Sequence, residues 1–163
     1  MFQFAEEFKL LPILAPQDIT EVTTYTQYVD IKTQNWATFL VQFGNIAGAD
    51  SVVSVEASTA ASSNATEATV PFRYRLSAAV ATDTMGAITA ATSDGVTIAA
   101  ASDDNKLLVI EVDPAALPSN PGADFRFLRV KVAPASSSAT NTVVGVTAVL
   151  APRYPGNSIP SAT

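Results

Sequence analysis

The sequence predicts an all-β fold, an antiparallel β-sandwich or β-barrel of roughly eight to nine short strands with extended N- and C-terminal arms. Three observations support this prediction. Short segments alternate apolar and polar residues with the period of two that strands require. Turn residues separate most of these segments, and no segment has the pattern of a long helix. A chain of 163 residues also has the size of one domain with a substantial core.

The first 20 residues are predicted to form an apolar N-terminal arm. Pro12 and Pro16 prevent a helix from running through it, because proline lacks an N–H group and clashes with the preceding turn. One helical turn is expected over residues 5–9. The segment either packs on its own domain, as a strand or an arm, or lies on a neighbouring subunit. In the second case the interface residues are Phe2, Phe4, Phe8, Leu10, Leu11, Ile13 and Leu14.

The β-domain is expected to span residues 21–151 and to open with strands at residues 22–31, 36–43 and 51–59. β-branched and aromatic residues dominate the first strand, and Trp36 opens the second as a core or core-edge anchor. In the second and third strands one face collects apolar side chains. These side chains are Phe39, Val41, Phe43, Val53, Val55 and Ala57.

The middle of the chain contains one clear strand and one undecided part. Residues 58–69 are small and polar, which is typical of a loop. The strand that follows begins at Pro71, and its alternating residues are Phe72, Arg73, Tyr74, Arg75, Leu76 and Ser77. Residues 85–89 and 95–101 are interpreted as two short strands joined by a turn in which Gly95 supplies a positive φ.

A turn at residues 102–105 is expected to lead into a strand at residues 106–113. After that strand, Asp113 and Pro114 suit the capping and first positions of a single helical turn. The alternation assigns the strand's side chains to two faces. Leu108, Ile110 and Val112 are expected to be buried, whereas Leu107, Val109 and Glu111 are expected to face outward.

Residues 124–151 are predicted to form a β-hairpin, because two apolar runs flank a small polar connection that contains Pro134. The parity of the first run breaks between Phe127 and Leu128, which indicates either a β-bulge or a second face that is buried at one end only. The second run is apolar on both faces and is therefore placed centrally in a sheet. Residues 152–163 are rich in proline and are expected to form an extended tail.

Four basic residues lie on two of the predicted strands. Arg73 and Arg75 share one face of their strand, and Arg129 and Lys131 share one face of theirs. If the two strands pair, these side chains form a basic stripe. We interpret it as the wet face of a sheet, with contact to an acidic protein surface as the alternative.

The usual residues of nucleophilic and transition-metal chemistry are missing, because the sequence contains no His and no Cys. The lysines lie in no Ser-x-x-Lys context, and the glycines form no phosphate-binding loop. Asp103, Asp104 and Asn105 are adjacent but lack the spacing of a calcium loop, so we interpret them as solvated turn residues. We therefore expect no catalytic residue, cofactor or metal site, and a protein that is not an enzyme.

The composition argues against nucleic acids and membranes as partners. The net charge is −6, and the nine basic residues form no cluster that would bind phosphates. No uninterrupted apolar run approaches the about 20 residues of a membrane span, and acidic rather than basic residues precede the first apolar run, unlike a signal peptide. Because only 15% of the residues are charged, we expect partner chains to cover part of the surface.

Three stretches resemble a known family. They read YVDIKTQNWATFLVQFGNIAGAD at residues 28–50, FRYRL at residues 72–76, and FRFLRVKVAP followed by VVGVTAVLAPRYP between residues 125 and 155. The chain resembles small proteins encoded near the major capsid protein of tailed bacteriophages, which are head decoration (cement) or minor capsid proteins. The resemblance implies a virion structural protein that binds the outer face of the capsid and stabilises the shell.

The resemblance also implies partners and contact segments. The partners are the major capsid protein and further copies of the chain, for which a homotrimer fits the local three-fold positions of a capsid lattice. Residues 1–16 and 152–163 are then docking arms, and Arg153 and Tyr154 are contact residues of the second arm.

Two other functions remain open. The first alternative is a tail, connector or head-fibre component of the virion, and the second is a carbohydrate-binding β-sandwich. Carbohydrate sites need exposed aromatic side chains. The candidates are Trp36, Tyr25, Tyr28, Tyr74 and Tyr154.

Overall fold

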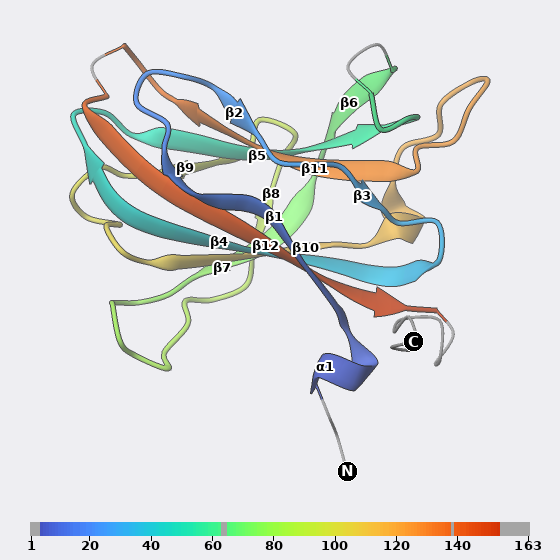
Figure 1. Cartoon of the computed structure of the whole chain (residues 1–163), viewed down its shortest axis with the longest axis horizontal. Coiled ribbons are helices and arrows are strands. Elements are labelled where there is room, and N and C mark those ends of the chain that lie inside the picture. The colour runs from blue at the N-terminus through green and yellow to red at the C-terminus, as the bar shows by residue number, and fades with distance from the viewer. Residues whose placement is uncertain (1–3, 63–64, 138, 154–163) are drawn as a thin grey trace.

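A computed structural model describes residues 4–62, 65–137 and 139–153, and these residues form two antiparallel sheets packed face to face (Figure 1). Sheet A contains β1 (Lys9–Asp18), β12 (Asn141–Pro152), β4 (Gln34–Ala47), β10 (Leu107–Val112), β7 (Phe72–Leu76) and β8 (Thr89–Ala91), in that order. Sheet B contains β2 (Thr24–Tyr25), β11 (Phe127–Pro134), β5 (Ser51–Ser58) and β6 (Glu67–Val70), while β3 (Val29–Asp30) pairs with β11 and β9 (Val96–Ile98) with β5.

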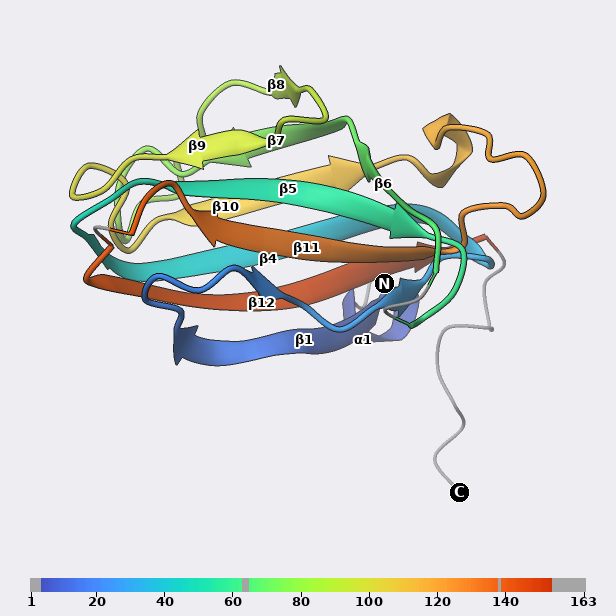
Figure 2. The same cartoon turned by 90° about the horizontal axis from the view of Figure 1, so that it is seen from above.

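The predicted all-β sandwich is confirmed, with twelve strands in the described part of the chain rather than eight or nine. Seen from above, sheet A runs from β1 at one margin to β8 at the other (Figure 2). The expected strand at residues 22–31 is split into β2 and β3, and β6 forms at the end of the expected loop at residues 58–69. The sequence pattern therefore predicted the fold class but fewer strands than the structure contains.

The core lies between the sheets and is built from alternate residues of each strand. Every side chain that the alternation in β4, β5 and β10 assigned to the interior is buried. These residues are Phe39, Val41, Phe43, Val53, Val55, Ala57, Leu108, Ile110 and Val112.

The hairpin predicted for residues 124–151 is wrong, because its two strands lie in opposite sheets. β11 pairs with β5 over eight residues, whereas β12 lies between β1 and β4. The chain passes from one sheet to the other between Pro134 and Asn141. The central place of β12 in its sheet is confirmed. β11 contains no bulge against β5, and Phe127 stays half-buried on the same face as Arg129, so partial burial of that face explains the parity break.

The N-terminal arm predicted for residues 1–20 is also corrected. Residues 9–18 are the edge strand β1, which pairs with β12 from Lys9↔Leu150 to Asp18↔Val143. This is the own-domain alternative, and prolines are tolerated there because an edge strand leaves backbone groups unpaired. The expected helical turn appears as α1 (Phe4–Glu7). Of the predicted tail, Pro152 continues β12 and Arg153 is described.

The part between residues 81 and 106 contains two short strands that join different sheets; β9 lies within the expected strand at residues 95–101, whereas β8 shares only Thr89 with the expected strand at residues 85–89. β8 pairs with β7, and β9 pairs with β5. The turn between them has Gly95 at φ +90°. A 3₁₀ turn, η1 (Pro114–Ala116), follows β10, and its cap is the Asp113 carboxylate, which accepts from the Ala115 N–H at 2.9 Å.

The proposed basic stripe does not form, because its two halves belong to different sheets. Arg73 and Arg75 lie on β7 of sheet A, and Arg129 and Lys131 lie on β11 of sheet B. Within the described ranges, no helix is long and apolar enough to cross a membrane.

Candidate functional site

The outward side of sheet A carries few charges. Alternate residues of its strands fill the core, so the pleat turns the others outward. The register arranges ten of them in two rows across five strands, and we call these ten residues face A. One row is Leu10, Val149, Thr38, Glu111 and Arg73, and the other is Pro12, Thr147, Leu40, Val109 and Arg75. Five neighbouring strands span about 20 Å, so face A is wide enough for a protein partner.

Two projections border face A. α1 extends from the start of β1, and the loop at residues 77–88 extends from the end of β7, both on the side of the molecule away from sheet B (Figure 1). Large apolar side chains are exposed at both borders: Phe4 at 48%, Leu10 at 42%, Val80 at 56% and Ile88 at 49%. Exposed apolar groups that gather at one surface favour contact with another protein.

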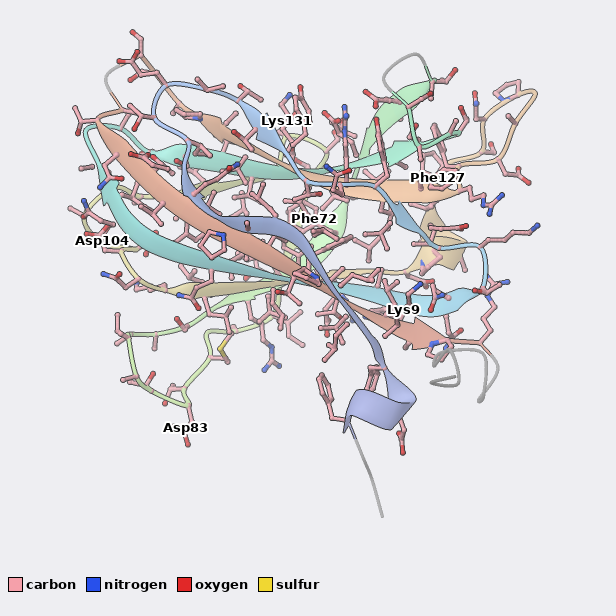
Figure 3. The ribbon with its side chains drawn as sticks, viewed as in Figure 1. Lys9, Phe72, Asp83, Asp104, Phe127 and Lys131 are labelled. Carbon is pink, nitrogen blue, oxygen red and sulfur yellow. The ribbon has the colours of Figure 1, made fainter. Side chains whose placement is uncertain are left out.

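The loop at residues 77–88 has a defined shape. The Ala78 N–H donates to the Thr84 carbonyl at 3.0 Å, and the Gly86 N–H donates to the Leu76 carbonyl at 2.8 Å. Asp83 lies near its tip, away from the two sheets (Figure 3). The backbone hydrogen bonds therefore hold the apolar loop in place next to face A.

Charge on face A is confined to its β10–β7 side. The Arg73 guanidinium lies 3.3 Å from the Glu111 carboxylate and 5.2 Å from the centre of the Trp36 ring. Within the ranges that the structure describes, the Arg75 side chain has no hydrogen-bond or ion-pair partner. Face A thus offers a long apolar part and one cation that is free to meet an acidic group.

The outward side of sheet B has the opposite character, because its charges satisfy one another. Arg129 donates to Glu56 at 2.8 Å and to Glu67 at 2.7 Å, and its guanidinium lies 4.1 Å from the Tyr25 ring and 4.9 Å from the Tyr28 ring. The Tyr28 hydroxyl donates to Glu67. We call these five residues the Arg129 cluster.

Burial and hydrogen bonds set the proton affinities in the Arg129 cluster. Burial raises the pKa of Tyr28, and the hydrogen bond to Glu67 raises it further. Burial alone would lower the pKa of Arg129, but the hydrogen bond and charge of Glu56 outweigh it, so the pKa is raised. Arg129 therefore keeps its charge, and the cluster fastens residues 24–30 onto sheet B instead of presenting free groups.

The predicted interface residues fall into three groups. Phe4 and Leu10 are exposed, and Phe8 is half-buried with its ring 5.1 Å from that of Phe4. Ile13 is buried in the core, which contradicts its prediction as a contact residue, whereas Leu11 and Leu14 are half-buried and pack against the core. Arg153 is exposed, and its Nε donates to the Gln34 carbonyl at 3.0 Å. Phe2 and Tyr154 lie outside the described residues.

The aromatic residues considered for sugar binding are engaged within the protein. Arg73 lies over the Trp36 ring, and Arg129 lies over those of Tyr25 and Tyr28. Tyr74 is half-buried and packs edge-on against Phe72, with 6.3 Å between ring centres. Tyr25 remains 41% exposed, but its ring and those of the other described candidates already have partners within the protein.

The turn carboxylates are structural. Asp50 accepts from the Ala100 N–H at 2.8 Å, Asp104 from the Ile46 N–H at 2.8 Å, and Asp103 from the Ala99 N–H at 2.9 Å. Asp103 also pairs with Lys106 at 2.9 Å. These groups close one end of the sandwich, and the described residues contain no cluster of three acids that would hold a metal ion.

Among the cavities on the described surface, two have charged residues in their lining. One of about 400 Å³ lies beside Trp36, between β7 and η1, and the Arg73–Glu111 ion pair lies on its wall. The other, of about 340 Å³, is lined by Ile31, Lys32, Thr59, Pro114, Asp124, Phe125, Arg126 and Arg153.

Comparisons with protein families, with curated proteins and with solved structures found no match for this chain. The fold and its surfaces are therefore the basis for the functional argument. The sequence predicts Phe4, Phe8 and Leu10 as contact residues, but it does not predict that Leu40 and Val109 lie on the same surface. The sequence signal for these two residues is that each is apolar at an outward position of its strand, β4 or β10.

Proposed function

We propose that the chain is a structural protein of a tailed-bacteriophage virion that binds the outer surface of the capsid and stabilises the shell, and that it docks through face A. The observation that carries this proposal is the contrast between the two outer sides. Face A is uncharged except on its β10–β7 side, Leu10 on it is exposed, and exposed Phe4, Val80 and Ile88 lie at its borders, whereas the charges opposite are satisfied internally. The absence of His and Cys from the sequence supports a non-catalytic role.

Many weak contacts suit this function. A specific protein interface buries about 800 Å² on each partner, and only part of its apolar burial appears as affinity. On a shell, many copies act together, so each copy needs only moderate affinity to hold neighbouring capsomers. The proposed partners are the major capsid protein and two further copies of this chain in a trimer.

Binding to empty capsids tests the proposal. Leu40 and Val109 are half-buried neighbours at the centre of face A, and glutamate at both positions places two charges in the contact. We expect the Leu40→Glu, Val109→Glu variant to lose at least about tenfold in affinity, measured by co-sedimentation with capsids. The matched control is Thr97→Glu, an exposed β9 residue on sheet B, which should bind normally.

Unchanged capsid binding by a folded face A variant would contradict the docking proposal. Imaging of labelled particles distinguishes the head from the tail, connector or head fibre, since a cement protein covers the head at high copy number. Light scattering of the free protein tests the trimer.

A further inference from the structure

The second cavity has a chemistry that neither face A nor the fold requires. Three of the nine basic residues of this acidic chain line it: Lys32, Arg126 and Arg153. They come from the segment between β3 and β4, from the residue before β11, and from the end of β12. One lining residue, Asp124, is acidic, and Asp30 pairs with Arg126 from outside the lining, so the cations at this site exceed the carboxylates by one in a chain whose net charge is −6.

The walls of this cavity are fixed by backbone hydrogen bonds. The Ile31 N–H donates to the Arg126 carbonyl at 2.9 Å, and the Arg126 N–H donates to the Ser58 carbonyl at 3.0 Å. The Arg153 N–H donates to the Thr33 carbonyl at 2.9 Å. Arg126 and Arg153 are therefore anchored at their backbones, and the Lys32 N–H donates to the Asp30 carboxylate at 3.0 Å.

The cations also keep unused donors. Arg126 is held by Asp30 through its Nε and one terminal nitrogen, and Arg153 uses its Nε for the Gln34 carbonyl. Within the described ranges, the Lys32 ammonium has no hydrogen-bond or ion-pair partner. An incoming anion would therefore find free N–H groups without first breaking an existing ion pair.

We propose that this cavity binds a carboxylate side chain presented by an acidic segment of a partner protein. The floor next to the cations is apolar, with half-buried Phe125 and Pro114 beside buried Ile31, which suits the hydrocarbon part of a Glu or Asp side chain. A nucleic acid fits less well, because a net charge of −6 repels a run of phosphates.

The cavity beside Trp36 is less suited to bind an anion. Its cation, Arg73, is already paired with Glu111 and lies over the indole ring, so a ligand would have to displace both contacts. The carboxylate site does not depend on docking through face A, and the two sites can be tested separately.

The test is a titration of the whole protein, followed by NMR, with an acetylated, amidated tri-glutamate peptide and, separately, with inorganic phosphate. The peptide should shift the backbone amide signals of Lys32, Arg126 and Arg153 in a saturable way, and added salt should weaken the effect. The Lys32→Glu, Arg153→Gln variant should bind the peptide about tenfold more weakly or not at all. A variant with Lys9→Glu, which lies outside the cavity, should bind like the unchanged protein.

Three outcomes would overturn the site: no saturable peptide shift, equal loss in the Lys9→Glu control, or phosphate binding without peptide binding. Arg153→Gln also removes a hydrogen bond to the Gln34 carbonyl, so the single variant Lys32→Glu is tested as well. Its urea unfolding midpoint should equal that of the unchanged protein. Equal peptide affinity in that folded variant also contradicts the proposal. If light scattering shows that the cavity variant alone loses self-association, the acidic partner is a second copy of the chain, and the site stands.

Discussion

Gly95 is required by both its backbone conformation and its surroundings. Its φ of +90° is unfavourable for residues with a side chain, and a Cβ atom there would lie 2.3 Å from the Val53 carbonyl oxygen. We expect Gly95→Ala to lower the free energy of unfolding by about 2–4 kcal/mol in urea denaturation. Gly122 has a φ of +108° and open space around it, so Gly122→Ala should cost only about 1 kcal/mol. Equal losses would show that the close approach does not matter.

Arg129 forms ion pairs with two carboxylates, those of Glu56 and Glu67, and these pairs offset the free-energy cost of their burial. Its side chain is 12% exposed and that of Glu56 is 10% exposed, so removing the guanidinium leaves a carboxylate largely buried without its partner. Arg129→Ala should therefore lower the free energy of unfolding by about 3 kcal/mol. The control is Arg73→Ala, whose ion pair is exposed and should contribute less than about 1 kcal/mol. A similar small effect at both positions would contradict the structural role of the Arg129 cluster.

Two aspartates predict a loss of stability in acid. The Arg126 side chain holds the pKa of Asp30 below its ordinary value, and the Thr142 and Thr20 hydrogen bonds lower the pKa of Asp18. A carboxyl with a lowered folded pKa stabilises the protein above its unfolded pKa, about 3.9, and this contribution disappears as the pH falls through the folded pKa. An Asp18→Asn, Asp30→Asn variant should thus show a smaller fall in unfolding free energy between about pH 5 and pH 2. An unchanged pH profile would contradict this assignment.

At the level of elements, β1 is the strand whose role the structure changed most. It buries Ile13 and completes sheet A against β12, and its Ile13 carbonyl accepts from the Gln27 N–H at 3.0 Å. The same strand therefore connects sheet A to residues 24–30 on the edge of sheet B.

Truncation separates α1 from β1. Removal of residues 1–7 should leave the urea midpoint nearly unchanged, because β1 remains paired with β12. Removal of residues 1–18 should cost at least about 3 kcal/mol, since it uncovers the edge of β12 and removes the buried Ile13 side chain. A fully stable fragment that lacks residues 1–18 would show that this segment is an arm after all.

At the level of the whole molecule, the topology predicts slow folding. Sheet A brings residues 9–18 against residues 143–150, so strands near the two ends of the described chain must meet before the sheet is complete. All-β domains with such distant pairings fold in milliseconds to seconds. Stopped-flow refolding monitored by Trp36 fluorescence should give rates in this range, and folding in microseconds would contradict the topology.

The charge and polarity of the two outer surfaces also depend on how the whole molecule is folded. Arg73 and Arg75 resemble Arg129 and Lys131 in sequence, yet the first pair lies on the β7 side of face A and the second belongs to a satisfied ion-pair network. The sequence predicts Phe4, Phe8 and Leu10 as contact residues, and Phe4 and Leu10 are exposed. Their continuation across Leu40 and Val109 required the register of β1, β12, β4 and β10.

The sequence alone determined the fold class and the inward face of the main strands. Phe39, Val41 and Phe43 lie at alternate positions, and the pleat turns such positions to one side of the sheet, because the side that a residue faces depends only on the strand itself. The same local logic identified the capped turn at Asp113 and the positive φ at Gly95.

Only the tertiary structure decided which strands are neighbours. In a sandwich, both sheets offer the same apolar interior, so the pattern of β11 and β12 fits a hairpin as well as two opposite sheets. The long pairings of β12 with β1 and β4 stabilise the arrangement in which β11 and β12 lie in opposite sheets. The composition of face A follows from this choice of neighbours, and for that reason it could not be predicted from single strands.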